Sequence, residues 1–167
     1  PMAGITGSTQ PILGFNYGSG NIDRVKDGQK KTLLVCIVFT VVMMTLAHTI
    51  SPYFVRLFTN DKIYMDLSIK AIKIFTLMIV PLAVQYTIVD GFTGISAVKY
   101  AITLSCFRKA FYFAAMVVFP IIVGIENVFY AEPVVDVISS ILSAFVYFKC
   151  MSKILDKRLD TLKIKSI

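Results

Sequence analysis

Four long apolar stretches determine what this chain can fold into. They cover about residues 32–54, 71–89, 100–123 and 127–148, each close to the ~20 apolar residues that a helix needs to cross a bilayer. Hydrophobic residues make up 56% of the 167 residues and charged residues only 16%, whereas soluble domains carry about 25% charged residues. A soluble core of this size could not bury so much apolar surface. The sequence therefore predicts an all-α, polytopic membrane protein with four transmembrane helices.

The segments around these stretches are short. Residues 1–22 contain apolar residues and end in a glycine-rich turn, so they are predicted to be the end of a truncated fifth helix. The chain opens without an initiator methionine or a basic leader, which predicts a piece of a longer chain rather than a signal peptide. Residues 23–151 are predicted to hold the four helices. Residues 152–167 alternate charged and apolar residues, which predicts a cytoplasmic tail lying as a helix on the inner leaflet.

The lysines and arginines predict how the chain is oriented. Apart from Arg108 and Lys109 inside the third stretch, eleven lie before the first stretch, in the loop around Ser96 or after the fourth stretch, and four lie on the opposite side. By the positive-inside rule, both chain ends face the cytoplasm. The expected location is the cell membrane, of the bacterial inner-membrane type. The net charge of +7 follows from this topology, with some attraction to anionic lipid, and predicts no nucleic-acid partner.

The fourth stretch carries polar residues along one helical face. Its members are spaced by three or four residues, so at 100° per residue they fall within roughly 80° of one another. They are Glu132, Asp136, Ser139, Ser143 and Tyr147. Acids that face lipid are costly, so this face is predicted to point into the bundle or a wet cavity; two carboxylates one turn apart disfavour each other's ionisation, which suits proton transfer. The alternative is that Glu132 and Asp136 lie near the outer interface and are hydrated.

Charged and polar residues in the second and third stretches give further candidates. Arg108 lies about two turns into the third stretch, so its side chain needs either an acidic partner or a conformation that extends to the membrane interface. Asp90, at the cytoplasmic end of the second stretch, is expected at a similar depth and is the candidate partner. The alternative is that each reaches the interface separately. Gln85 and Tyr86 are candidates for hydrogen bonds to a substrate or ion, and a packing role is their alternative.

The sequence contains no enzyme or cofactor signature. Cys36, Cys106 and Cys150 lack the spacing of a metal site, a redox pair or a disulfide framework. Nucleophile-elbow, Walker and zinc-protease motifs are absent. The chain is therefore expected to be no enzyme and to bind no metal or organic cofactor.

Residues 10–18 carry the most specific motif in the chain. Their sequence, Gln-Pro-Ile-Leu-Gly-Phe-Asn-Tyr-Gly, followed by Asn21 and Arg24-Val25, resembles a segment of the MATE (multidrug and toxic compound extrusion) family. In that family the segment ends the eighth transmembrane helix and begins the loop to the ninth. Three further segments resemble the family in the same order: residues 57–61 after helix nine, 104–108 in helix eleven, and 131–133 with Asp136 at the start of helix twelve.

The resemblance implies that the chain covers the end of helix 8 and helices 9–12, in the C-terminal lobe of a twelve-helix antiporter. The family exports organic cations and other amphipathic compounds in exchange for H⁺ or Na⁺, by rocking two six-helix lobes about a central cavity. The implied partners are the missing N-terminal lobe, helices 7 and 8 of the same transporter, a cationic or amphipathic small molecule and the bilayer. The principal ion site is expected outside this chain. Two alternatives remain, an exporter of lipid-linked saccharides with a related fold and a membrane scaffold that transports nothing.

Overall fold

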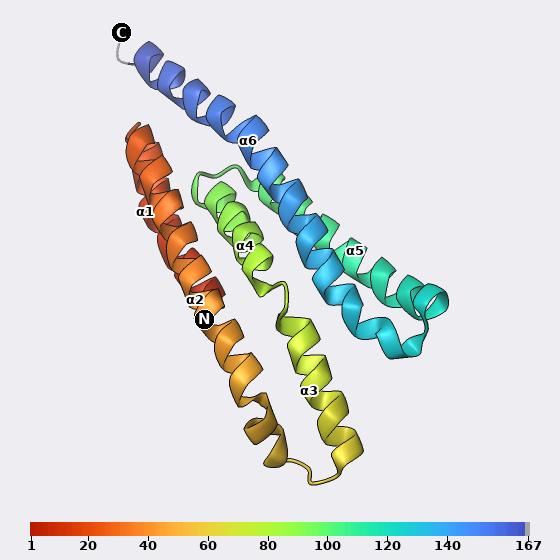
Figure 1. Cartoon of the computed structure of the whole chain (residues 1–167). Helices are drawn as coiled ribbons and strands as arrows, with labels where there is room; N and C mark the ends of the chain where they lie inside the picture. The colour runs from red at the N-terminus through yellow and green to blue at the C-terminus, as the bar shows by residue number, and fades with distance from the viewer. Residues whose placement is uncertain (166–167) are drawn as a thin grey trace.

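The described residues, 1–165 of the computed structural model, fold into helices joined by short turns (Figure 1). The elements in order are α1 (Met2–Gly18), α2 (Ile22–Arg56), α3 (Lys62–Thr76), α4 (Ile79–Gly94), α5 (Val98–Val123), the 3-10 helix η1 (Ile125–Tyr130) and α6 (Ala131–Lys165). The prediction of an all-α fold is therefore confirmed.

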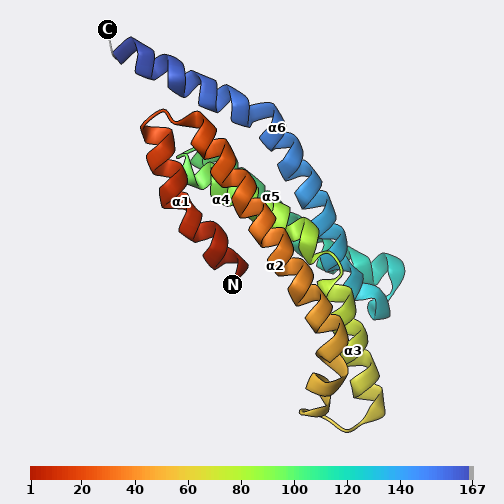
Figure 2. The same ribbon diagram turned by 60° about the vertical axis from the view of Figure 1, so that its left-hand side comes forward.

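Within residues 1–165, three helical stretches are long and apolar enough to cross a membrane. They are α2, α5 and residues 127–164, which include most of α6. The pair α3 and α4 makes a fourth candidate span, with a bend of 42° between the two helices (Figure 2). The chain therefore has the helices of a multi-pass membrane protein. The second predicted stretch, residues 71–89, falls across this bend instead of forming one straight helix.

A proline accounts for the break between α3 and α4. Pro81 is the third residue of α4, so the carbonyl four residues before it belongs to Leu77, which lies in the break. Proline has no N–H to donate to that carbonyl, and its ring clashes with it. The proline therefore favours a bend or a break at this point. The hydroxyl of Ser140 in α6 donates a hydrogen bond to the Pro81 carbonyl, which fastens α6 beside the break.

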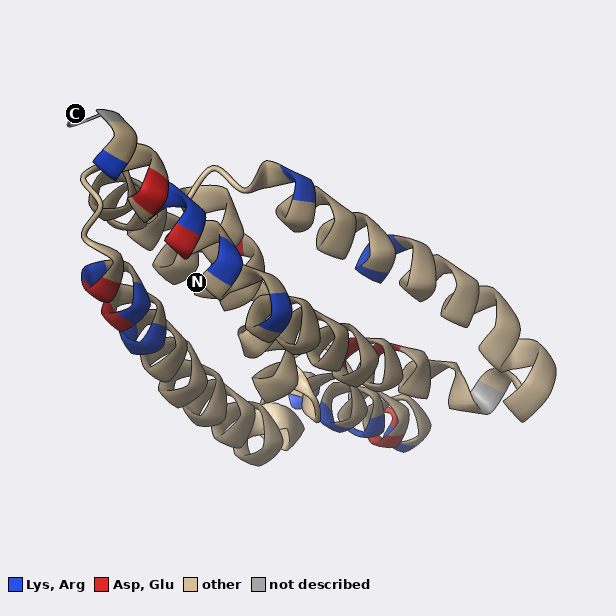
Figure 3. Ribbon diagram, turned by 90° about the horizontal axis from the view of Figure 1, so that it is seen from above, with Lys and Arg blue, Asp and Glu red and all other residues tan. Residues whose placement is uncertain are grey.

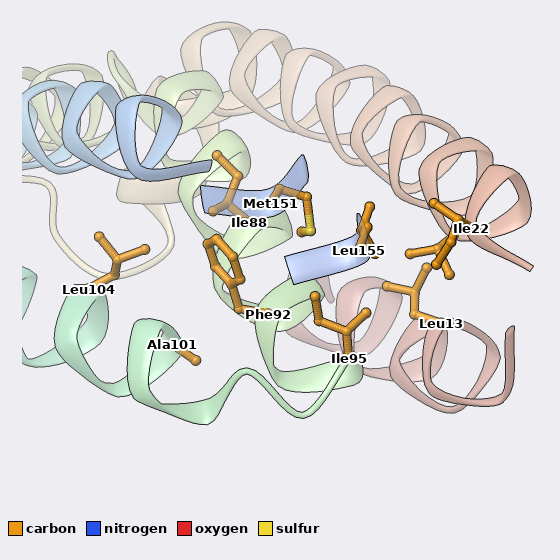
Figure 4. Close-up of a cluster of buried hydrophobic side chains, with 10 residues drawn as sticks. Leu13, Ile22, Ile88, Phe92, Ile95, Ala101, Leu104, Met151 and Leu155 are labelled. Atoms are coloured by element: carbon orange, nitrogen blue, oxygen red, sulfur yellow. The ribbon is translucent and has the colours of Figure 1, made fainter. Parts of the chain in front are cut away.

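The central helix of the bundle is α4, which packs against α1, α2, α5 and α6 (Figure 1). Its Ile88 and Phe92 belong to the main apolar cluster, together with Leu13 of α1, Leu104 of α5 and Leu155 of α6 (Figure 4). Most of the outer apolar surface is exposed by contrast: only 11% of the apolar window of α2 and 6% of that of α5 is buried. The core is thus narrow and follows α4, while α2 and α5 present apolar side chains outward, as helices in contact with lipid do.

Two glycines allow α1 to approach α4 closely. A Cβ atom on Gly14 would lie 2.9 Å from the backbone oxygen of Gly94, and one on Gly94 would lie 3.1 Å from the backbone oxygen of Gln10. Both contacts are with backbone atoms, which cannot rotate away as a flexible side chain does. Small residues that let backbones approach are a common way to pack helices in membranes.

The residues predicted as a separate tail continue α6 without a break up to Lys165, and residues 166–167 lie outside the described part of the chain. The last turns of α6 lean over the connection between α1 and α2 (Figure 2). Leu155 is 1% exposed in the main cluster, and a Cβ on Gly20, in that connection, would lie 2.7 Å from Leu162. The apolar side of this segment therefore packs on the protein.

We expect that Gly14→Ala destabilises the protein by about 1–3 kcal/mol relative to Gly7→Ala, because the new methyl group is forced against the Gly94 backbone. Gly7 lies in the same helix, and a Cβ added there would meet no atom within 4 Å, so both variants gain the same helix propensity. Thermal or denaturant unfolding of the full-length protein in detergent measures the difference. Equal stability of the two variants would contradict the close approach.

Candidate functional site

Arg108 of α5 lies between two carboxylates of α6. Its Nη2 donates to Asp136 Oδ1 at 2.7 Å and to Glu132 Oε1 at 3.0 Å, and its Nε lies 3.3 Å from the same Asp136 oxygen. The side chains are enclosed, with exposed fractions of 13% for Arg108, 2% for Asp136 and 22% for Glu132. We call these three side chains the Arg108 cluster.

The depth of the Arg108 cluster explains why it forms. Arg108 is eight residues past the start of the apolar stretch at residue 100, which places it about 12 Å along the helix inside a span whose hydrocarbon thickness is about 30 Å. An unpaired charge at that depth costs ~2.5–3.5 kcal/mol on insertion scales. Glu132 and Asp136 are one helical turn apart and so present both carboxylates to the same neighbour. With both ionised, the three groups carry one net negative charge.

The predicted pair of Asp90 with Arg108 is wrong. Asp90 instead accepts a hydrogen bond of 2.9 Å from Nε2 of Gln10 in α1. Asp90 and Arg108 lie on neighbouring helices, but Asp90 faces α1 while Arg108 faces α6. Charge at similar depth was therefore a poor guide to the partner, because depth does not fix the direction in which a side chain leaves its helix.

Gln85 and Tyr86 lie beside the Arg108 cluster. They line a small cavity of about 90 Å³ together with Val89, Ser105, Arg108 and Lys109. The structure thus brings the four predicted pathway residues, Gln85, Tyr86, Glu132 and Asp136, into one region around Arg108.

The polar face of α6 continues inward from the cluster as buried hydroxyls. Ser139 is 1% exposed and Ser143 is fully buried. Within residues 1–165, the hydroxyls of these two serines and Oε1 of Gln85 are buried side-chain atoms without a hydrogen-bond partner. Buried polar atoms are nearly always hydrogen-bonded in folded proteins, so Ser139, Ser143 and Gln85, like Ser51 of α2, have unused hydrogen-bonding capacity.

Three polar residues of the fold were not singled out from the sequence. Gln10 bonds Asp90, Gln29 of α2 donates to the Thr87 carbonyl at 2.7 Å, and Ser140 bonds the Pro81 carbonyl. Gln10 lies in the most specific motif of the chain, which was a usable signal. Gln29 and Ser140 gave no such signal. Each bonds a backbone carbonyl of α4, and the sequence does not show which carbonyl lies within reach.

The carboxylates of Glu132 and Asp136 are the oxygen ligands that a hard monovalent cation or a proton would use. In the part of the chain that the structure describes, no group of three or more His, Cys, Asp or Glu side chains is placed to hold a metal ion.

Fold and site together define a class of protein: a helical, multi-pass membrane protein with an ion cluster enclosed between two spans. Ionisable residues in that position are typical of substrate and ion pathways. The model of the MatE family matches residues 1–118, and the chain belongs to that family. The matched part includes Arg108 and ends before Glu132 and Asp136. The family resemblance of the sequence motifs is thereby confirmed.

A solved structure supports the same fold. The chain is similar to the crystal structure of the Vibrio cholerae MATE transporter VcmN in the bent form, with a TM-score of 0.76 and 18% sequence identity. The similarity covers 90% of this chain and 34% of the transporter chain, so this chain spans about a third of that protein. No curated protein matches the chain.

We expect Arg108→Gln and Asp136→Asn to be energetically coupled. Removing Arg108 leaves the two carboxylates without a counter-charge, and such a loss costs about 3–5 kcal/mol in a buried pair, whereas Asp136→Asn still leaves Arg108 paired with Glu132. The double variant should therefore lose about 1–3 kcal/mol less than the sum of the single variants. Unfolding free energies of the full-length protein in detergent measure this coupling.

The matched control is Arg108→Gln combined with Asp90→Asn. These two changes should add within about 0.5 kcal/mol, since Asp90 bonds Gln10. Coupling of Arg108 to Asp90 as large as its coupling to Asp136 would contradict the observed pairing.

Proposed function

We propose that this chain is part of a secondary-active antiporter that exports organic cations or related drugs in exchange for H⁺ or Na⁺. The observation that carries the proposal is the Arg108 cluster, a buried set of one guanidinium and two carboxylates between α5 and α6. Membership of the MatE family and the fold shared with a MATE transporter support it.

The charge balance of the cluster suggests how coupling works. One guanidinium faces two carboxylates, so binding of one proton or one Na⁺ brings the cluster to neutrality. A charged cluster has a higher free energy next to lipid than a neutral cluster, and this difference is smaller next to water. Ion binding therefore shifts the balance between two conformations of the transporter, as an exchange cycle requires.

The size of the cavity beside Arg108 restricts what binds there. A volume of about 90 Å³ has room for an ion with a few waters, whereas drug-sized ligands occupy pockets of roughly 300–1,000 Å³. The substrate is therefore assigned to a larger space, between these helices and the rest of the transporter. In this scheme Gln85 and Tyr86 contact the coupling ion or its waters from α4.

The proposed setting is the cell membrane, with both ends of the chain and the turn between α4 and α5 in the cytoplasm. The excess of lysine and arginine at that end supports this orientation. The proposed partners are the N-terminal lobe and the helices that precede this segment. An isolated segment would transport nothing, because the central cavity needs both lobes.

Transport by the full-length protein tests the proposal. In everted vesicles, where export from the cytoplasmic side becomes uptake, accumulation of a cationic dye in the lumen is followed under an imposed proton or sodium gradient. Asp136→Asn and Glu132→Gln should each reduce gradient-driven transport by about ten-fold or more, because typical coupling free energies correspond to 5–150-fold effects. Asp66→Asn, which removes an exposed acid of α3, should leave the rate within about two-fold.

Three results would contradict this proposal in different ways. Absence of gradient-driven transport for every cationic substrate would remove the antiporter. Movement of a lipid-linked saccharide, without dye accumulation, would replace it with the related exporter. Transport that survives both acid substitutions would restrict the Arg108 cluster to a structural role.

A further inference from the structure

A second, basic cavity lies at the opposite end of α6 from the Arg108 cluster. It has a volume of about 540 Å³ and is bounded by the last turns of α6, the end of α1 and the turn that leads into α5. Its polar and charged lining residues are Tyr17, Ser96, Tyr100, Cys150, Lys153, Lys157, Arg158 and Thr161. Seen from above, lysines and arginines gather along this part of α6 and at the start of α2 (Figure 3).

The charge of this cavity is uncompensated. Three cations, Lys153, Lys157 and Arg158, line it, and no aspartate or glutamate does. Over the described residues, neither Lys153 nor Lys157 forms an ion pair. Asp156 and Asp160 lie on the same stretch of α6 and are exposed, as Lys153 and Lys157 are, but neither acid is part of the lining. A cavity with this lining favours an anion.

The walls of the cavity are held in place by contacts of their own. Arg158 donates from Nη2 to the Gly18 carbonyl at 2.6 Å and from Nε to the Tyr17 carbonyl at 3.2 Å. Its guanidinium also lies 5.5 Å from the centre of the Tyr17 ring. Across the cavity, Tyr100 stacks on Phe92 with ring centres 5.3 Å apart. Arg158 thus joins α6 to the end of α1, while the two lysines extend from a fixed frame.

The cavity lies at the depth of lipid headgroups. Phe148, 80% exposed, is the last large apolar residue of the fourth stretch, and Lys153 follows it by five residues, about 7.5 Å along the helix. The headgroup layer extends roughly 5–7.5 Å beyond the hydrocarbon core on each side. Lysine side chains can reach several ångströms back toward this layer, so Lys157 is within range as well.

We propose that this cavity binds the phosphate-bearing headgroup of an anionic phospholipid, with Lys153 and Lys157 as its ligands and Ser96 and Tyr100 as neutral hydrogen-bond donors. Basic pockets between transmembrane helices on the cytoplasmic side are suited to such headgroups. A lipid fits better than a soluble phosphate because the apolar part of α6 leads directly to the cavity and supplies a surface for acyl chains. The assignment is independent of the transport proposal, since it involves none of the residues of the Arg108 cluster.

Native mass spectrometry of the delipidated full-length protein tests this assignment. Phosphatidylglycerol should bind as a defined first lipid, at least ten-fold tighter than phosphatidylcholine. A lysine that directly contacts the phosphate of the bound lipid is expected to contribute about five-fold, so K153Q/K157Q should weaken phosphatidylglycerol binding by about 25-fold. K153R/K157R keeps both charges and should retain binding.

K26Q/K30Q is the matched control. It removes two exposed lysines of α2, also four residues apart and also at the basic end, from outside this cavity. It should change phosphatidylglycerol affinity by less than about three-fold, because only general attraction is lost. Equal losses in the two glutamine variants, or equal binding of the two lipids, would overturn the site. Displacement of phosphatidylglycerol by millimolar inorganic phosphate would overturn the lipid assignment and favour a soluble phosphate compound.

Discussion

The cost of placing Arg108 in the middle of a membrane span organises this end of the molecule. A guanidinium at that depth needs a carboxylate within reach, and the structure provides two from the same face of α6. Meeting that need fixes both the register and the rotation of α6 against α5. Once Asp136 faces Arg108, the residues that follow on the same face, Ser139 and Ser143, are carried into the interior. The buried polar face is therefore a consequence of one ion pair.

Polar and close backbone contacts hold the central helix where the hydrophobic effect gives little help. Lipid tails are as apolar as leucine, so apolar contact alone hardly favours one helix arrangement over another in a membrane. Each of three neighbours of α4 has a specific attachment instead: Gly14 at the crossing with α1, Gln29 of α2 on the Thr87 carbonyl, and Ser140 of α6 on the Pro81 carbonyl. These contacts specify the arrangement, while the narrow apolar cluster around Phe92 fills the space between them.

The sequence predicted the spans and the candidate residues better than their pairings. Apolar length and helical spacing depend on local geometry, so the fourth stretch and its polar face could be read directly. The partner of Arg108 could not be predicted from the sequence, because it depends on how η1 packs against α5. This short helix packs back along α5, so α6 begins beside the middle of α5 instead of at its outer end. Glu132 and Asp136, four residues apart at the start of α6, thereby come level with Arg108. The break in the second stretch was readable in principle from Pro81, since proline's missing N–H is a local property.

The sign of the charged residues changes along α6, from acids near its start to an excess of lysine and arginine near its end, and each part of the helix lies in a different environment. Near its start, inside the bundle, the helix carries two acids that are both paired with one guanidinium of the protein itself. Seventeen residues after Asp136, about 25 Å along the helix, Lys153 is exposed and forms no ion pair with a carboxylate of the described chain. At that depth the bilayer itself supplies fixed negative charge as phosphate. A charge inside the span must therefore find its counter-charge in the fold, whereas one at the interface can find it in the lipid. The single helix α6 satisfies both conditions.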